Sequence, residues 1–351
     1  MGALSQYIHT DADHITRWLL VFAILSLRYV LMAGGAYLLF YVYKRRAWLH
    51  RKIQQKFPDK QHLKYEVMHS FLTFAVFGFM VILGNLMRGQ GWVAEYGNFT
   101  DRPLWYFIGS TVFLLLFHDT YFYWIHRAMY HRKVYMLVHR VHHNSNNPSP
   151  LAAFSFHPIE AVLEFSFIPL IHLFVPLHGA SFLILSITMI LFNIMGHLGY
   201  ETLPTWFVRH WFFKWINTST NHNMHHKYVS CNYGLYLNVW DRLMGTHHKK
   251  YELIFEAVAG RPAAEGRQLH RRRLADGDAV AGAGHLPAHG GRSDAEMAVD
   301  LAGRGLGPAA GLAPLPALAD AGGGRALPRS PRADGEAAWL GLRQDRPAGG
   351  V

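Results

Sequence analysis

Histidines gathered in short clusters are the residues of this chain best suited to chemistry. Eight of them form three clusters in chain order: His126 and His131, then His139, His142 and His143, then His222, His225 and His226. The second and third clusters share the pattern HxxHH. Residues at i, i+3 and i+4 project from one face of a helix, so each pattern can bring up to three imidazoles to one point. This spacing predicts a metal site.

The histidine spacing predicts that a metal binds but does not identify which metal. Imidazole binds zinc, copper, iron and nickel, so ligand type alone leaves the metal open. The eight histidines, with His157 and His197 as further candidates, exceed the four ligands of a structural zinc and suggest two ions with about five nitrogens each. The motifs HExxH, GxSxG, GxGxxG and the Walker loop are absent, which argues against zinc proteolysis, serine-type hydrolysis and nucleotide binding.

The balance of residue types is that of a membrane protein. Of 351 residues, 51% are hydrophobic and 14% aromatic, while 16% are charged. The single cysteine, Cys231, cannot form an internal disulfide, so nothing requires an oxidising compartment. We attribute the net charge of +11 to basic loops beside membrane spans, because long apolar runs accompany it, and we expect no nucleic-acid partner.

Apolar segments long enough to cross a bilayer, about 20 residues, predict three spans, at 18–43, about 67–87 and about 104–125. The connection at 44–64 carries eight Lys and Arg, which the positive-inside rule assigns to the cytoplasm. Two shorter runs, roughly 161–177 and 180–196, predict a helical hairpin that either crosses the bilayer or returns on one side. In either topology the histidine clusters and His197 lie on the cytosolic face of a multi-pass membrane protein.

The composition changes abruptly near residue 258. Beyond it the chain is rich in Ala, Gly, Arg and Pro, with Trp339 as its one aromatic residue, so it cannot bury enough apolar surface to fold alone. We expect a disordered tail. A reading-frame slip in a GC-rich gene would produce the same switch, and resequencing around codon 258 tests that hypothesis.

The expected fold class is therefore all-α. We predict a membrane helical bundle of about three spans plus a helical hairpin, with a cytosolic helical cap that holds a histidine-lined dimetal site. The chain divides into N-terminal spans with a basic loop (1–103), a catalytic part (104–257) and a low-complexity tail (258–351).

Three motifs and the segments between them carry a family resemblance. HRAMYH, HRVHH and NHNMHH resemble the three histidine boxes of the membrane fatty acid hydroxylase and sterol desaturase superfamily. PSPLAAFSFHPIE, HLGYETLP and NYGLYLNVWDRLMGT resemble, in order and spacing, the sterol desaturases of lathosterol-oxidase type. The resemblance covers about residues 104–248, and the first two spans and the tail lie outside it.

The resemblance implies a cytosol-facing di-iron centre that uses O2 and two external electrons to attack an unactivated C–H bond of a membrane lipid. Electrons from NAD(P)H would arrive through a separate reductase and a cytochrome- or ferredoxin-type carrier, because the chain contains no haem or flavin domain. The favoured substrate is a sterol or sterol-like lipid, as in C-5 sterol desaturation. A fatty-acyl, carotenoid or alkylglycerol hydroxylase of the same superfamily is the alternative.

Carried over residue by residue, the resemblance assigns the metal ligands as His126, His131, His139, His142, His143, His157, His197, His222, His225 and His226. A loop histidine bonded to backbone is the alternative for His157. Asp119 and Asp241 are expected to orient imidazoles by accepting their other N–H, with helix capping or a salt bridge as the alternative. His118 is expected to be a packing residue.

A second class of function is a membrane metalloprotein without redox chemistry, such as a metal or proton transporter that uses histidine relays. Transport predicts histidines distributed across the spans, whereas these gather on one expected face. A catalytically inactive scaffold would be expected to have broken histidine boxes, and none is broken.

Overall fold

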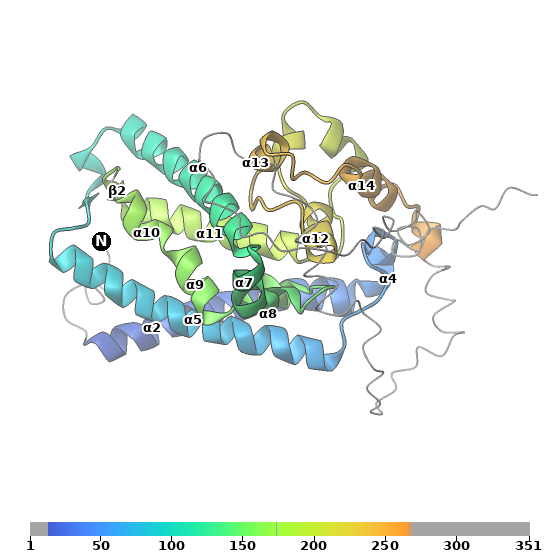
Figure 1. Cartoon of the computed structure of the whole chain (residues 1–351), viewed down its shortest axis with the longest axis horizontal. Helices are drawn as coiled ribbons and strands as arrows, with labels where there is room; N and C mark the ends of the chain where they lie inside the picture. Colours follow the sequence, from blue (N-terminus) through green and yellow to red (C-terminus); the bar gives the residue numbers. More distant parts are fainter. Residues whose placement is uncertain (1–12, 173, 267, 269–351) are drawn as a thin grey trace, which may run out of the picture. The chain divides into compact units, whose positions relative to one another are not determined.

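The computed structural model describes residues 13–172, 174–266 and 268. This part of the chain is mostly helical, as predicted (Figure 1). Its two short strands, β1 (Glu95–Tyr96) and β2 (Leu177–His178), pair in parallel with Glu95 opposite Leu177. The expected disorder beyond residue 268 lies outside the described residues.

Within the described residues, three helices are long and apolar enough to cross a membrane: His14–Tyr43, Lys60–Gly89 and Gly179–Gly196. The first begins as α2 (His14–Tyr29), where the Asp13 side chain accepts a hydrogen bond from the Thr16 N–H at 2.7 Å, and continues through π-helical turns to Tyr43. The second, α5 (Lys60–Gly89), begins after Asp59 in the same way. The third is α11 (Gly179–Gly196). They correspond to the first two predicted spans and the second arm of the predicted hairpin.

The predicted third span and the first arm of the hairpin differ from expectation. The third span is one helix, α6 (Leu104–Met129), but it is not among the three membrane candidates, and its second half carries the polar residues His118 and Asp119. The first arm forms two short helices, α9 (Pro158–Phe165) and α10 (Phe167–Ile171), which are too short to cross a bilayer. Only the second arm is long enough to span.

An aromatic core joins the N-terminal helices to the segment that precedes α9. The ring of Phe74 on α5 lies 5.3 Å from that of Tyr29 on α2 and 5.4 Å from that of Phe154, and all three are buried. The Tyr29 hydroxyl donates to the Leu151 carbonyl at 2.8 Å. Because lipid is as apolar as these side chains, van der Waals packing between the rings and not transfer from water stabilises this contact within a membrane. This packing holds the 150–154 turn against the long helices.

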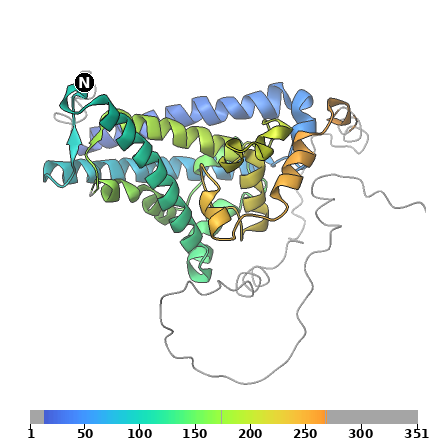
Figure 2. The ribbon, with the colours of Figure 1, turned by 90° about the horizontal axis from the view of Figure 1, so that it is seen from above.

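The remaining short helices gather near one end of the long ones (Figures 1 and 2). They are α4 (Arg45–Trp48), α7 (Arg132–Val134), α8 (Arg140–His143), α12 (Ser219–Tyr228), α13 (Val239–Leu243) and α14 (Tyr251–Ala259). Helix α14 crosses the predicted start of the tail at residue 258. Val258 and Ala259 are buried, and Arg261 Nη1 donates to the Lys52 carbonyl at 2.9 Å, so the packed part extends beyond that boundary.

Candidate metal centre

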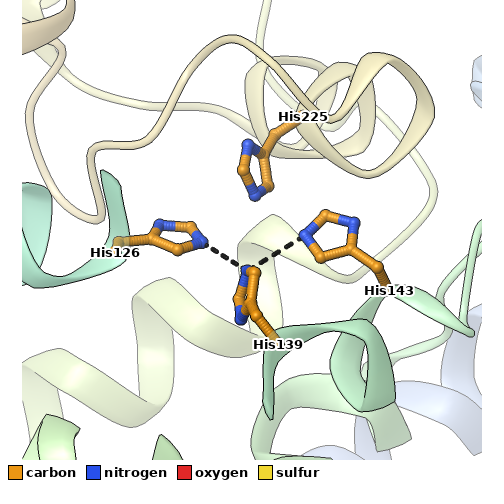
Figure 3. Close-up of side chains that lie close together, drawn as sticks. All are labelled: His126, His139, His143 and His225. Carbon is orange, nitrogen blue, oxygen red and sulfur yellow. Dashed lines mark hydrogen bonds between the residues drawn. The ribbon is translucent and has the colours of Figure 1, made fainter. Parts of the chain in front are cut away.

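Eight buried histidines converge as two groups of four. The first histidine group is His126, His139, His143 and His225, and the second is His142, His197, His222 and His226. Within each group the possible ligand nitrogens all lie within 4.8 Å of one another. Figure 3 shows the rings of the first group approaching a common point from different elements. The groups adjoin, since the ring centroids of His143 and His226 are 4.7 Å apart.

Each HxxHH pattern contributes to both groups. The i and i+4 residues of the first pattern, His139 and His143, enter the first group, and its i+3 residue enters the second. The other pattern does the reverse: His222 and His226 enter the second group and His225 the first. On a helix, i+4 lies about 40° from i, while i+3 lies about 60° to the other side. The structure therefore divides each pattern between two points, where the spacing suggested one.

One histidine from outside the patterns completes each group. His126 lies on α6, and His197 is the residue that ends α11. Gly196 allows the close packing beside His197, because a Cβ at this position would lie 3.1 Å from Cδ2 of His222. The second group is therefore assembled directly at the end of a candidate membrane helix.

Backbone carbonyls and one carboxylate orient the imidazoles of the first group. Nδ1 of His126 lies 2.8 Å from the Tyr233 carbonyl, and Nδ1 of His225 lies 2.6 Å from the Cys231 carbonyl. Nδ1 of His139 lies 2.7 Å from Oε1 of Glu160. A carbonyl only accepts hydrogen bonds, so the proton of His126 and His225 is on Nδ1 and their Nε2 carries a lone pair.

Backbone carbonyls orient two imidazoles of the second group. Nδ1 of His142 lies 3.3 Å from the Ser155 carbonyl, and Nδ1 of His197 lies 2.7 Å from the Asn193 carbonyl. Nε2 of His197 is 3.1 Å from Nε2 of both His222 and His226. By contrast, Nδ1 of His143 and of His226 has no hydrogen-bond partner among the described residues.

These contacts test whether the groups fit a metal ion. His142 and His197 both donate through Nδ1, yet their Nε2 atoms are 3.3 Å apart. Two nitrogen lone pairs at this distance repel each other unless a cation lies between them. Among the described residues no carboxylate oxygen belongs to either group, and an all-imidazole donor set suits a transition metal. The residues fit metal ions.

Burial sets the charge of these side chains. It lowers the pKa of His126 and of His197 to about 4, and it lowers the pKa of the other six imidazoles well below the ordinary value. All eight are therefore neutral near pH 7, which is the form that binds metals. Burial also raises the pKa of the Glu160 carboxyl. A metal cation bound to His139 would lower that pKa, because a nearby positive charge favours the ionised carboxylate.

Two predicted ligands, His131 and His157, lie outside both groups. His131 is exposed and stands at the start of α7, beyond the end of α6. It is five residues after His126, which corresponds to a rotation of about 140° on a helix, so the two cannot share a face. Nδ1 of His157 accepts from the Ile159 N–H at 3.2 Å and caps α9. The structure thus favours the backbone-bonded alternative for His157.

The two predicted aspartates accept hydrogen bonds from backbone N–H groups and not from imidazoles. Asp119 accepts from the Tyr236 N–H at 2.8 Å, and Asp241 accepts from the N–H groups of Tyr233 and Gly234, both at 2.8 Å. Among the described residues neither contacts a histidine of the two groups, which corrects the expectation. They fix the 233–237 loop, whose Tyr233 carbonyl receives the Nδ1–H of His126. Their influence on the site therefore passes through the backbone.

His118 is a packing residue, as expected. It is buried, its ring lies 4.4 Å from that of Phe167, and its Nδ1 lies 2.9 Å from the Tyr236 hydroxyl.

Sequence reasoning missed two residues that touch the first group. Glu160 contacts His139, and the Tyr130 hydroxyl contacts three of the four Nε2 atoms. A signal existed for the tyrosine, because Tyr130 stands four residues after His126 and hence on the same helix face. Glu160 lies within the HPIE segment that the sequence analysis noted. The direction of its side chain could not be predicted, because it depends on where α9 packs.

A narrow cleft lies beside the second group. It is lined by the apolar residues Phe192, Met195 and Leu235, by the polar residues Asn193, Asn217 and Thr218, and by Gly196, His197 and His222. Its volume, about 10 Å³, is that of a single water-sized sphere. A larger molecule would have to displace these apolar side chains to reach the histidines.

Comparisons with known proteins agree with the site. Residues 111–246, which include both histidine groups, match the family model described as Fatty acid hydroxylase. A Delta(7)-sterol 5(6)-desaturase of Gibberella zeae is 28% identical over 256 residues, which cover 71% of this chain and 72% of the relative. Human lathosterol oxidase is 32% identical over 179 residues, or 50% of this chain and 56% of the relative. No solved structure matches significantly.

These findings agree with the resemblance that the histidine patterns predicted: residues 111–246 match a fatty acid hydroxylase domain, and the chain is similar to sterol desaturases and lathosterol oxidases. Its similarity to desaturase and oxidase enzymes supports an oxidoreductase.

Proposed function

We propose that the protein is an O2-dependent di-iron enzyme that desaturates or hydroxylates an unactivated C–H bond of a membrane lipid. The favoured substrate is a sterol or sterol-like lipid, as in C-5 sterol desaturation, because curated relatives are sterol desaturases and lathosterol oxidases. The observation that carries the proposal is the pair of adjoining groups of four buried imidazoles. Zinc has no redox chemistry, so iron is the proposed working metal.

When bound, the two irons would supply the oxidation of the C–H bond by O2 and two external electrons. The chain supplies the environment. Eight neutral nitrogens bind the ions, and hydrogen bonds from Nδ1 to fixed carbonyls keep the Nε2 lone pairs directed inward. Burial of the eight side chains excludes bulk water, which protects reactive species from side reactions.

The end of α11 offers a route for a lipid. This candidate membrane helix ends beside His197, and the apolar residues Phe192 and Met195 on its last turns line the cleft next to the second group. A lipid that moved along α11 would stay in apolar surroundings until it met the histidines. We expect Phe192 and Met195 to move aside as it enters.

The basic connection between the first two spans supports a cytosolic location. Gln54 lies within this connection, and its Nε2 donates to Oδ1 of Asn223 on α12 at 3.0 Å. Ile53 donates through its backbone N–H to the Gly199 carbonyl, also at 3.0 Å. Because the positive-inside rule assigns the 44–64 connection to the cytoplasm, the histidines packed against it would face the cytosol. A soluble cytochrome or ferredoxin could then deliver electrons from NAD(P)H through its reductase.

A lipid profile of cells that express the chain tests the proposal. The arms are the wild type with and without oxygen, His142→Ala, and His131→Ala as a matched histidine control outside both groups. We expect a new lipid, lighter by two hydrogens or heavier by one oxygen, only with oxygen and only in the wild type and His131→Ala. Unchanged sterol and fatty-acyl profiles in every arm would overturn the proposal.

A further inference from the structure

The hydroxyl of Tyr130 lies inside the first histidine group. Its oxygen is 2.8 Å from Nε2 of His225 and 3.1 Å from Nε2 of His139, and it also contacts Nε2 of His143. The side chain is buried, with 8% of its surface exposed. The phenolic oxygen therefore meets three of the four nitrogens at the point toward which they converge.

A bound cation would account for this arrangement. His225 donates its Nδ1 proton to the Cys231 carbonyl, so its Nε2 is an acceptor. A cation would also favour the ionised form of Glu160, which then accepts the Nδ1 proton of His139 and leaves a lone pair on Nε2 of that histidine. A phenol has a single O–H proton and can serve only one of these two nitrogens, whereas a cation among them would attract both nitrogen lone pairs and the oxygen lone pairs together.

The local backbone explains why Tyr130 faces inward and its neighbour does not. Tyr130 ends α6 with helical dihedral angles, so it keeps the face of His126 four residues earlier, whereas His131 has ψ of 129° and turns away. The Tyr130 ring is held by stacking on Tyr135 at 5.4 Å and by contact with Tyr233 at 4.9 Å. The hydroxyl is thus fixed in position before any metal binds.

We propose that Tyr130 is an oxygen donor to the metal ion of the first group, an inference that rests on the proposed metal centre. The first site then has four nitrogens and one oxygen, while the second has four nitrogens. As the metal–oxygen bond forms, the phenolic O–H bond breaks and the proton passes to the buffer, as for other ligands that bind deprotonated. Tyrosine is an established iron ligand, in the haem of catalase.

The test compares the purified, iron-loaded full chain with Tyr130→Phe, which removes only the hydroxyl. Tyr233→Phe is the matched control, because this tyrosine packs against Tyr130, His126 and His225 through its ring. Iron is loaded as Fe(II), oxidised with ferricyanide and counted per chain. Resonance Raman scattering and visible absorption then report a ferric–phenolate bond independently of any lipid substrate.

We expect a phenolate charge-transfer band and tyrosinate vibrations in the wild type and in Tyr233→Phe. Tyr130→Phe should lose both, with iron affinity at one of its two sites weakened at least about tenfold. A fully iron-loaded wild type without tyrosinate vibrations would overturn the inference, as would a Tyr130→Phe protein that keeps them. The wild-type spectrum decides the matter even if Tyr130→Phe does not fold. A protein that shows the phenolate bond but oxidises no lipid would contradict only the proposed function.

Discussion

The two histidine groups are built in the same way, with the two HxxHH patterns exchanging roles, but different side chains surround them. Each takes an i, i+4 pair from one HxxHH pattern, the i+3 residue from the other and one histidine from a long helix. The first group touches a carboxylate, Glu160, and a phenol, Tyr130, whereas the ring contacts of His142 and His197 to other elements of the second group's surroundings are to backbone carbonyls. The repeated pattern thus makes the nitrogen sets alike, and the neighbouring side chains make the two sites unequal.

The second difference is access. The second group adjoins the cleft at the end of α11, whose lining includes Phe192, Met195 and Leu235, while the first is enclosed by Tyr130, Tyr233 and Phe122. An anionic neighbour favours the more highly charged state of an ion, and an apolar opening favours contact with a lipid. We therefore expect the first site to hold the more readily oxidised ion and the second to face the substrate.

The largest effects should come from removing one nitrogen donor from each group. His139→Ala and His142→Ala are each expected to lower lipid oxidation by at least about 100-fold, because the proposed reaction needs both ions. Each variant should lose about one iron per chain, from a different site. Iron content and product formation measured together test this. Two irons retained in either variant would show that the division into two groups is wrong.

Glu160→Gln should affect the two sites unequally. The amide keeps the shape of the side chain but removes the anionic acceptor of the His139 Nδ1–H, which should weaken iron binding at the first site by about 10–100-fold. Competition with a chelator measures the affinity of each site. Glu95→Gln, on β1 and outside both groups, is the control and should change neither. Equal weakening of both sites would remove the contrast between them.

Asp241→Asn should act mainly on stability. The carboxylate accepts from Tyr233, Gly234 and the Thr246 hydroxyl while buried, so its loss is expected to lower the free energy of unfolding by about 2 kcal/mol. Iron at the first site should weaken only several-fold, because His126 depends on Asp241 through the Tyr233 carbonyl. Thermal unfolding in detergent measures the effect, with the exposed turn residue Asp101→Asn as control. Normal stability combined with complete loss of iron would mean that Asp241 acts on the metal directly.

The smallest effect is expected for His131→Ala. This side chain is exposed and lies outside both groups, so iron content, unfolding midpoint and oxidation rate should match the wild type. The same three measurements on His126→Ala, its partner in the first cluster, should show loss of iron. If His131→Ala also loses an iron, the assignment of Tyr130 to the first site fails.

Features that depend on local sequence could be predicted. Long apolar runs identify α2, α5 and α11, since hydropathy and length suffice for a membrane helix. Clustered histidines and the segments between them identify the family, because a metal site needs particular residue types at particular spacings. The exceptions were local too. His118 and Asp119 make α6 more polar than a typical span. Pro169, within α10, has no N–H to bond the Phe165 carbonyl four residues earlier, where α9 ends.

The amino-acid sequence by itself determined the long apolar helices and the spacing of the histidines, and with them the resemblance to a histidine-box superfamily. Only the tertiary structure decided that each HxxHH pattern contributes to two groups and that Tyr130 lies where His131 was expected. It also decided that Glu160 contacts an imidazole, whereas Asp119 and Asp241 accept hydrogen bonds from backbone. The physical reason is that spacing determines which side chains share a helix face. What that face meets depends on how distant helices pack against it.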